Sequence, residues 1–352
     1  MPVREDQIAA CEMVFGGQRP DESLLSFALS ASVDLAIGKP GMFALEMEGY
    51  DENQGMGWME DDRFALGTIV EVKMGYRNSL ESLFYGTVMG IDLSLPASQP
   101  PRMTVRAFDL SHRMTRGEKR RAFANLKLSD IARKLAGEAG LTPRVHDSSD
   151  TREYVEQKGE TDMAFLLRLA EEMNYHLFVI HKEMTFKPAL RSASPRLRLA
   201  VDDNTLIDFQ AHLSLARQVS EVVVQGWDVA KQAAITGRAM AGDETWTMGG
   251  TKSASTLLKG NDQAVHLISE HPVMTQEEAN HFALARLNKV SLDLIEASGS
   301  AVGSAAMLPG EIIEIAGVSA SFKGLYCLTG TTHRFDFESG YTTNFSARRN
   351  SI

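Results

Sequence analysis

The chain has 352 residues, 43% of them apolar and 23% charged, which is enough material for two or three domains with hydrophobic cores. A mean hydropathy of -0.17, with 28 Gly and 11 Pro, excludes collagen-like and disordered proteins. The N-terminus lacks a secretory signal pattern, and Asp34 interrupts the longest apolar run, 24–38. The sequence therefore predicts a folded protein with no membrane insertion.

The negative charge is concentrated at one end of the chain. Residues 1–62 hold 13 acidic and 3 basic side chains, which accounts for the whole net charge of -10. A nucleic-acid-binding protein needs a basic surface for the phosphates, and the only candidate run, 113–121, is short and unevenly spaced. We therefore expect a solvated or interface loop there, and no sequence-specific nucleic acid binding.

Cys11 and Cys327 are the only cysteines, and neither belongs to a CxxC pair. This pattern excludes a disulfide framework and argues against a zinc site. One disulfide between the two residues remains open, although a reduced chain that folds in the cytoplasm is the simpler interpretation. No residue pattern in the sequence indicates a cofactor.

Strand patterns dominate the first third of the chain. Val70 and Val72 alternate with charged residues, which is typical of a strand with one buried face. Glu71 and Lys73 then lie on the face away from the core. Strands are predicted at 64–76, 83–95 and 102–110. Residues 1–111 are accordingly predicted to form a first β-barrel-like domain.

The next segment changes to a helical period and predicts a small α+β insert over 112–196. Ser129 is a candidate N-cap for a helix that stops at Gly140. A second helix is predicted to begin at Thr161 and to end at Asn174, a residue that tolerates the left-handed conformation of a helix C-terminus. Strands follow this helix in the sequence HLFVIHKEMTFKP.

Strand patterns return after residue 196. Thr275 and Glu278 form a capping box ahead of an apolar helical stripe. The prediction is a second β-barrel-like domain, 197–352, with a loop insertion near 241–263 and a helix near 275–290. An alternative assigns the strands of 197–240 to the first barrel.

The two β regions share a short internal repeat. The segment 67–72, GTIVEV, is similar to the segment 310–315, GEIIEI. Each is followed by Phe-x-Gly, at Phe84 and at Phe322, which opens another strand. The repeat suggests two related β domains.

A search for catalytic or metal-binding patterns finds no complete constellation. His176 and His181, and likewise His266 and the residue at 271, are five apart, a spacing that suits neither one helix face nor one strand face. The GGTKS segment at 249–253 departs from a phosphate-binding loop, and we interpret it as a flexible loop. GSAVG at 299–303 has Ala where a nucleophile elbow needs Ser.

Two acidic groups are the remaining candidates for chemistry. Glu60, Asp61 and Asp62 are consecutive, and Asp202 and Asp203 form a second group. Such carboxylates are able to bind a cation or to cleave glycosides, but acidic runs beside strands are usually solvated loops. The sequence contains no pattern in which a nucleophile, a base and an orienting group can be identified together.

The strand and helix motifs, taken in order, resemble the phage late control protein D family, the baseplate hub of contractile tails, which also resembles the front part of type VI secretion spike proteins. The matching segments are FALGTIVEVKMGY, LFYGTVMGID, TDMAFLLRLAEEMNYHLFV, EMTFKP, EVVVQGWDVAKQAAITGRA, TQEEANHFALARL and the ending LPGEIIEIAGVSASFKGLYCLTGTTHRFDFESGYTTNFSARR. The N-terminal acidic region and the loop near 241–263 match least.

This resemblance implies a structural, non-enzymatic hub: a trimeric ring that joins a six-fold tail tube to a three-fold spike. The implied partners are a separate spike protein, the tail tube or its initiator, and other baseplate (wedge) proteins. The implied location is the baseplate of a virion tail or of an injection particle. Two alternatives are a peptidoglycan-degrading tail enzyme and the same hub in a non-viral secretion or toxin-delivery system.

The resemblance also suggests roles for the surface residues. Glu71, Lys73 and Glu314 point away from the predicted barrel cores, and we expect them at the lumen of the ring or at a subunit boundary. Glu60, Asp61 and Asp62 are the candidate acidic cluster for docking a partner.

Overall fold

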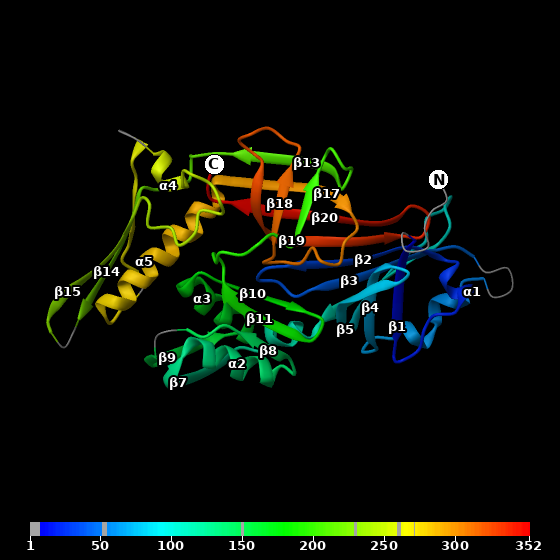
Figure 1. Ribbon diagram of the computed structural model, residues 1–352. Coiled ribbons are helices and arrows are strands. Elements are labelled where there is room, and N and C mark those ends of the chain that lie inside the picture. The colour runs from blue at the N-terminus through cyan, green and yellow to red at the C-terminus, as the bar shows by residue number, and fades with distance from the viewer. Residues whose placement is uncertain (1–7, 51–54, 149–150, 229–230, 259–261, 271) are drawn as a thin grey trace.

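The structure, a computed structural model, describes residues 8–50, 55–148, 151–228, 231–258, 262–270 and 272–352. It is mainly β with large antiparallel sheets and a small α+β insert, which confirms the predicted fold class. Figure 1 shows the main sheet, the insert below it, and α5 with its own sheet at one end. In the described residues, no helix is long and apolar enough to cross a membrane.

The first β unit contains six strands around one hydrophobic core. Its elements are β1 (Ala9–Phe15), α1 (Glu22–Leu25), β2 (Ala28–Ala36), β3 (Met42–Glu48), η2 (Gly57–Glu60), η3 (Asp62–Phe64), β4 (Ile69–Tyr76), β5 (Ser79–Ser94) and β6 (Arg102–Asp109). Phe15, Phe43, Phe64 and Phe84 are buried in this core and contact one another. Their burial contributes much of its stability, since a buried Phe is worth about 1.5 to 3 kcal/mol.

The insert has a core of its own. Its elements are η4 (Leu110–Thr115), β7 (Lys119–Lys127), α2 (Leu128–Glu138), β8 (Thr142–Val145), β9 (Thr151–Glu160), α3 (Asp162–Met173), β10 (Tyr175–Ile180) and β11 (Glu183–Pro188). Phe165, Leu166 and Leu169 of α3 are fully buried, so the predicted apolar stripe packs inside the insert.

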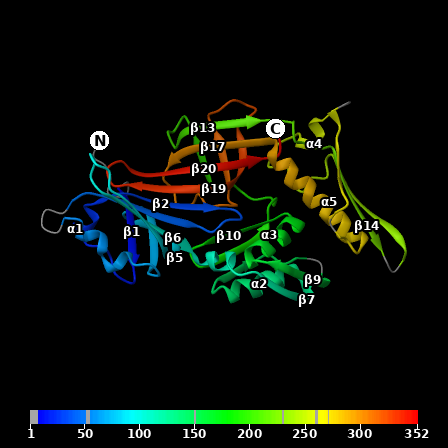
Figure 2. The same cartoon turned by 180° about the vertical axis from the view of Figure 1, so that it is seen from behind.

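The second β unit and a side unit make up the rest of the chain. The second β unit contains β12 (Leu197–Ala200), β13 (Leu206–Leu213), η6 (Leu292–Leu294), β17 (Ile295–Val302), β18 (Ile312–Ala316), β19 (Gly324–Asp336) and β20 (Gly340–Arg349). The side unit contains β14 (Glu221–Asp228), β15 (Ala233–Met240), α4 (Ala254–Leu257), β16 (Val265–Ile268) and α5 (Gln276–Ser291). Figure 2 shows α5 lying against β14 from behind.

The strands of 197–240 do not pair with the first β unit, in contrast to the alternative derived from the sequence. β12 pairs with β18, and β13 pairs with β17. β14 and β15 form a separate sheet with β16, covered by α5. The division of the chain at residues 111 and 196 stays a proposal, since one continuous sheet joins the first and last parts.

Two of the three predicted helix caps are confirmed. Thr161 Oγ1 accepts a hydrogen bond from the amide of Ala164 at 3.2 Å, and Asn174 has the left-handed φ of 51°. Thr275 Oγ1 accepts from the amide of Glu278 at 3.1 Å. These bonds satisfy amide groups that a helix leaves free in its first turn.

The predicted cap at Ser129 is wrong. Helix α2 begins at Leu128, with Lys127 as the N-cap residue and no side-chain cap of its own. The amide of Ser129 instead donates to Ser148 Oγ at 3.2 Å. A hydroxyl from a distant segment therefore satisfies this helix terminus, which a local pattern does not show.

The loop that contains GGTKS is held by the C-terminus of the chain. The amides of Thr251 and Lys252 donate to the carbonyl oxygen of Ile352 at 3.0 and 3.2 Å. Asn350 and Ser351 are fully buried beside them. The two cysteines are free thiols, Cys11 on β1 and Cys327 buried on β19.

The main sheet runs without a break through both β units. Its strand order is β1-β4-β5-β6-β3-β2-β19-β20-β17-β13, with β18 also on β19 and β12 on β18. The long strand β19 is shared: Gly324 to Cys327 pair with β18, and Gly330 to Asp336 pair with β2. A bulge between Leu328 and Gly330 separates these two halves. One strand thus belongs to both units.

The internal repeat corresponds to two equivalent hairpins. The first repeat lies on β4, which pairs with β5, and the second lies on β18, which pairs with β19. The two are two residues out of register, because Gly86 faces Val70 whereas Gly324 faces Ile315. The sequence repeat therefore marks similar hairpins with shifted pairing.

A buried histidine lies in the half of β19 that pairs with the first unit. His333 Nε2 is 3.0 Å from the carbonyl oxygen of Met307, and Nδ1 is 2.7 Å from the hydroxyl of Tyr341. A carbonyl oxygen only accepts, so Nε2 carries the proton and Nδ1 accepts from Tyr341. Burial lowers the pKa of His333 to about 4. The neutral ring satisfies both partners, and burial disfavours the charged ring.

We expect His333 to make the folded chain sensitive to acid. The histidine of the unfolded chain is protonated below about pH 6.5, whereas His333 of the folded chain is protonated only below about pH 4. The free energy of unfolding therefore decreases as the pH is lowered from about 6.5 to about 4. The stability advantage of the parent over His333→Gln is expected to shrink by about 1 kcal/mol per pH unit between pH 6 and 5. Urea unfolding of both proteins measures it, and a constant difference across this range would contradict the assignment.

Candidate assembly site

The outward residues of the repeated hairpins lie on the predicted side of their strands. Val70, Val72, Ile313 and Ile315 are buried, while Glu71, Lys73 and Glu314 are partly exposed. Strand alternation explains this placement. Whether these three side chains meet a lumen or another subunit stays a proposal.

Glu71 has neighbours from the same chain. Its carboxylate is 3.7 Å from His181 Nε2 of the insert and 3.8 Å from Lys73 Nζ. The Nζ of Lys182 lies 3.8 Å from the ring centroid of Tyr85, the residue opposite Glu71 on β5. This face of β4 and β5 thus contacts the insert, an arrangement that the sequence did not reveal.

The acidic cluster divides into one structural and two exposed carboxylates. Asp61 caps η3 and accepts from the amide and the side chain of Arg63, with a closest ion-pair distance of 2.8 Å. Hydrogen bonding to the Arg63 guanidinium lowers the pKa of Asp61. Glu60 and Asp62 are exposed. Only these two offer free carboxylate surface to a partner.

Arg63 joins the cluster to a second acid of the first unit. Its guanidinium is 3.1 Å from Asp21 Oδ2 and donates to the carbonyl oxygen of Arg19 at 3.1 Å. The hydrogen bond from the amide of Leu24 contributes most to lowering the pKa of Asp21 to about 2. Hydrogen bonds from the side chains of Ser23 and Arg63 lower this pKa further. Part of the N-terminal acidity is therefore neutralised within the chain.

The basic run 113–121 was predicted to be a loop, but its first residues lie on η4 and its last residues on β7. Two of its basic side chains are paired within the chain. Lys119 Nζ is 2.5 Å from Asp162, and Arg121 is 2.6 Å from the same carboxylate and 2.8 Å from Glu138. These pairs hold β7 against the start of α3. They reduce the positive charge that the run offers to phosphate.

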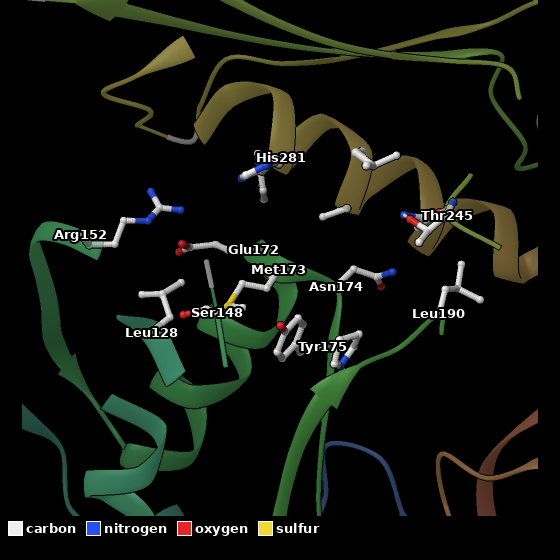
Figure 3. Close-up of a pocket in the computed structure, with 15 residues that line it drawn as sticks. Leu128, Ser148, Arg152, Glu172, Met173, Asn174, Tyr175, Leu190, Thr245 and His281 are labelled. Atoms are coloured by element: carbon white, nitrogen blue, oxygen red, sulfur yellow. Dashed lines mark hydrogen bonds between the residues drawn. The ribbon is translucent and has the colours of Figure 1, made fainter. Parts of the chain in front are cut away.

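A cavity of about 230 Å³ lies between the insert and α5. Figure 3 shows Glu172 and Tyr175 of the insert on one side and His281 of α5 on the other. Glu171 pairs with Lys289 at 2.6 Å and with Arg286 at 3.2 Å, which joins α3 to α5 beside this cavity. Burial raises the pKa of Glu172.

The cavity residues do not form a recognisable catalytic set. Its lining mixes apolar and polar side chains and contains no cysteine. Among all residues that the structure describes, no group of three or more His, Cys, Asp or Glu is placed to hold a metal ion. The cavity lies where the insert packs against α5.

The paired histidines are separated by their environments. His176 is buried and its pKa is lowered to about 3 by burial, whereas His181 is half-exposed beside Glu71. His266 lies on β16, and position 271 lies outside the described residues. Asp202 and Asp203 both pair with Arg198, at 3.6 and 2.9 Å.

Comparison with known families identifies one match. The family model described as the Alg8 N-terminal domain matches residues 42–336, and the chain belongs to this family. None of the curated proteins matches the sequence significantly.

Several solved structures share the fold. A tail protein of prophage MuSo2 from Shewanella oneidensis has a TM-score of 0.73 at 14% identity, covering 97% of this chain and 98% of that chain. A tail protein from Neisseria meningitidis has a TM-score of 0.71 at 11% identity, covering 97% and 96%. A type VI secretion component from E. coli, described as similar to the T4 bacteriophage tail proteins gp27 and gp5, has a TM-score of 0.56 at 14% identity, covering 92% and 74%. The chain thus has the fold of phage tail and related secretion proteins.

The two parts of the acidic cluster are expected to respond differently to substitution. Asp61→Ala removes a cap and the partner of Arg63, and it should lower the free energy of unfolding by about 1 kcal/mol. The double variant Glu60→Gln, Asp62→Asn should change it by less than about 0.5 kcal/mol. Denaturant unfolding of the three proteins measures both effects. Equal losses in the two variants would show that Asp61 has no special structural role.

Proposed function

We propose that this chain is a structural hub of the late control protein D type, located in the baseplate of a contractile phage tail or of a phage-like contractile injection system. The observation that carries the proposal is the likeness to the MuSo2 tail protein, which spans 97% of this chain and 98% of that one. The similarity to a type VI secretion component supports a role shared by phage tails and secretion systems.

The proposed hub is a homotrimer with the tail tube on one side and a separate spike on the other. The duplicated hairpins of β4–β5 and β18–β19 support this arrangement, because two similar units in each of three copies present six similar surfaces around one axis. Other baseplate (wedge) proteins would contact the periphery. The choice between a virion and a non-viral injection particle depends on neighbouring genes.

A non-enzymatic role fits the chemistry of the candidate groups. Glycoside cleavage needs two carboxylates on either side of a substrate, but Asp61 is bound to Arg63, and Asp202 and Asp203 share Arg198. The tail proteins of similar fold are named for their place in the tail. A peptidoglycan-degrading activity is the second candidate, and lysis of purified cell walls by the chain would favour it.

The stoichiometry of the assembled protein tests the proposal. We expect mass photometry of the chain, mixed with the spike protein of the same particle, to show three copies per complex. The chain alone provides the reference mass. A monomer under every partnered condition would contradict the hub.

We further propose that Glu60 and Asp62 help to dock a basic partner. Three copies bring about thirty net negative charges together, and such a density repels itself unless a cation or a basic surface balances it. Both side chains are exposed, and neither is tied to Arg63 as Asp61 is.

Charge removal at this cluster should weaken docking at low salt. The double variant Glu60→Gln, Asp62→Asn is expected to bind the spike or tube more weakly and with a smaller salt dependence. Glu118→Gln, Glu153→Gln removes two exposed charges from the insert and serves as the matched control. Identical affinity and salt dependence of the first variant and the parent would mean that the cluster is only a solvated surface.

A further inference from the structure

Several strands of the main sheet pair on one side only within the described residues: β1 pairs with β4, β12 pairs with β18, and two further edges lie on β13 and β5. β13 pairs with β17 alone. The C-terminal half of β5, from Gly90 to Ser94, pairs with β6 alone, because β4 reaches only as far as Thr87. Figure 1 shows β13 at the top of the sheet and β5 on its other side. Both edges present unpaired backbone groups.

The outward backbone groups of β13 follow from one hydrogen bond. The amide of Ser214 donates to the carbonyl oxygen of Leu294 at 3.0 Å. Alternate residues of an edge strand turn their N–H and C=O groups to opposite sides. Leu213, Ala211 and Phe209 therefore direct these groups away from β17.

The same reasoning applies to β5. The amide of Asp109 donates to Gly41 at 3.0 Å, so the odd-numbered residues of β6 face β3 and the even-numbered residues face β5. Gly90 and Asp92 are opposite even-numbered residues of β6. Ile91 and Leu93 consequently direct their N–H and C=O groups to the free edge.

The side chains at both edges are unusually apolar for solvated strands. The exposed apolar residues are Ile91 (41%), Leu93 (57%) and Leu95 (58%) at one edge and Ile207 (58%), Leu213 (37%) and Leu215 (40%) at the other. Neither 88–95 nor 206–215 contains a Lys, an Arg or a Pro. Proteins normally protect free edges with such residues. These two edges lack that protection, as expected for strands that acquire a partner.

Strand direction decides which edge suits which. From β5 to β13 the order is β5, β6, β3, β2, β19, β20, β17, β13, and each neighbouring pair is antiparallel. Because the series has eight strands and every step is antiparallel, its end strands, β5 and β13, run in opposite directions. β13 of one copy beside β5 of the next copy thus continues the antiparallel pattern.

We propose that copies of this chain assemble head to tail, with β13 of one copy pairing with the C-terminal half of β5 of the next copy. Two-fold pairing of one edge with itself leaves the other edge free, whereas head-to-tail pairing uses both edges of every copy. Closure of the ring after three copies rests on the proposed hub function. The paired edges then form one sheet around the axis.

Cross-linking tests this pairing directly. Leu93→Cys and His212→Cys place thiols on the two edges, and a bis-maleimide of about 10 Å spans neighbouring strands, which are about 4.8 Å apart. With the trimer assembled on its spike, the double variant should give covalent species of two and three copies on a denaturing gel. Each single variant, and the parent with Cys11 and Cys327, should give none.

Other cross-linking results would overturn the pairing. A single variant that links to itself would indicate two-fold contact of one edge. A cross-link to the spike would assign the edge to that partner. A trimer without cross-linked copies in the double variant would place the subunit contact elsewhere and leave the hub proposal intact, whereas the absence of any trimer would overturn both.

A charge substitution gives a second measurement. Leu93→Lys should weaken trimer formation at least tenfold, because it places a charge in the edge contact. Leu267→Lys is the matched control, since Leu267 is 58% exposed on β16, in a sheet separate from the main sheet. Equal trimer formation by the two variants would contradict the proposal.

Discussion

The sharing of β19 between two neighbours on the same side is the constraint on which the rest of the structure depends. Its first half pairs with β18 and its second half with β2, and the bulge before Gly330 allows the strand to serve both. Strands almost three hundred residues apart are thereby joined by backbone hydrogen bonds. The two β units cannot rotate against each other without breaking that ladder.

This constraint has consequences for assembly. Because the sheet is continuous, the free edges on β13 and on the C-terminal half of β5 are held in a fixed relation, which a ring of identical copies requires. The insert is fixed as well, through His181 beside Glu71 on one side and Glu171 beside Lys289 on the other. These contacts join the two β units, the insert and α5, in keeping with a structural role.

The sequence predicted features that depend on local chemistry. Thr161 and Thr275 cap their helices as expected, and Val70 and Val72 point into the core. The sequence did not predict features that depend on residues far apart in the chain. Ser148 accepts the hydrogen bond at the helix terminus where Ser129 was predicted as the cap. β2 pairs with β19, and no local pattern connects these two strands. The sequence groups Glu60, Asp61 and Asp62 as one acidic cluster, whereas in the structure the ion pair with Arg63 distinguishes Asp61 from the other two.

Hydrogen exchange in increasing urea tests the shared strand most directly. If β19 unites the two units, the amides of β2 and β20, which pair with opposite sides of it, should lose protection at the same urea concentration. The amides of Gly330 to Asp336 should lose protection at that same urea concentration. Exchange of β2 at a clearly lower urea concentration, with β17 and β20 still protected, would show two independent units and contradict this account.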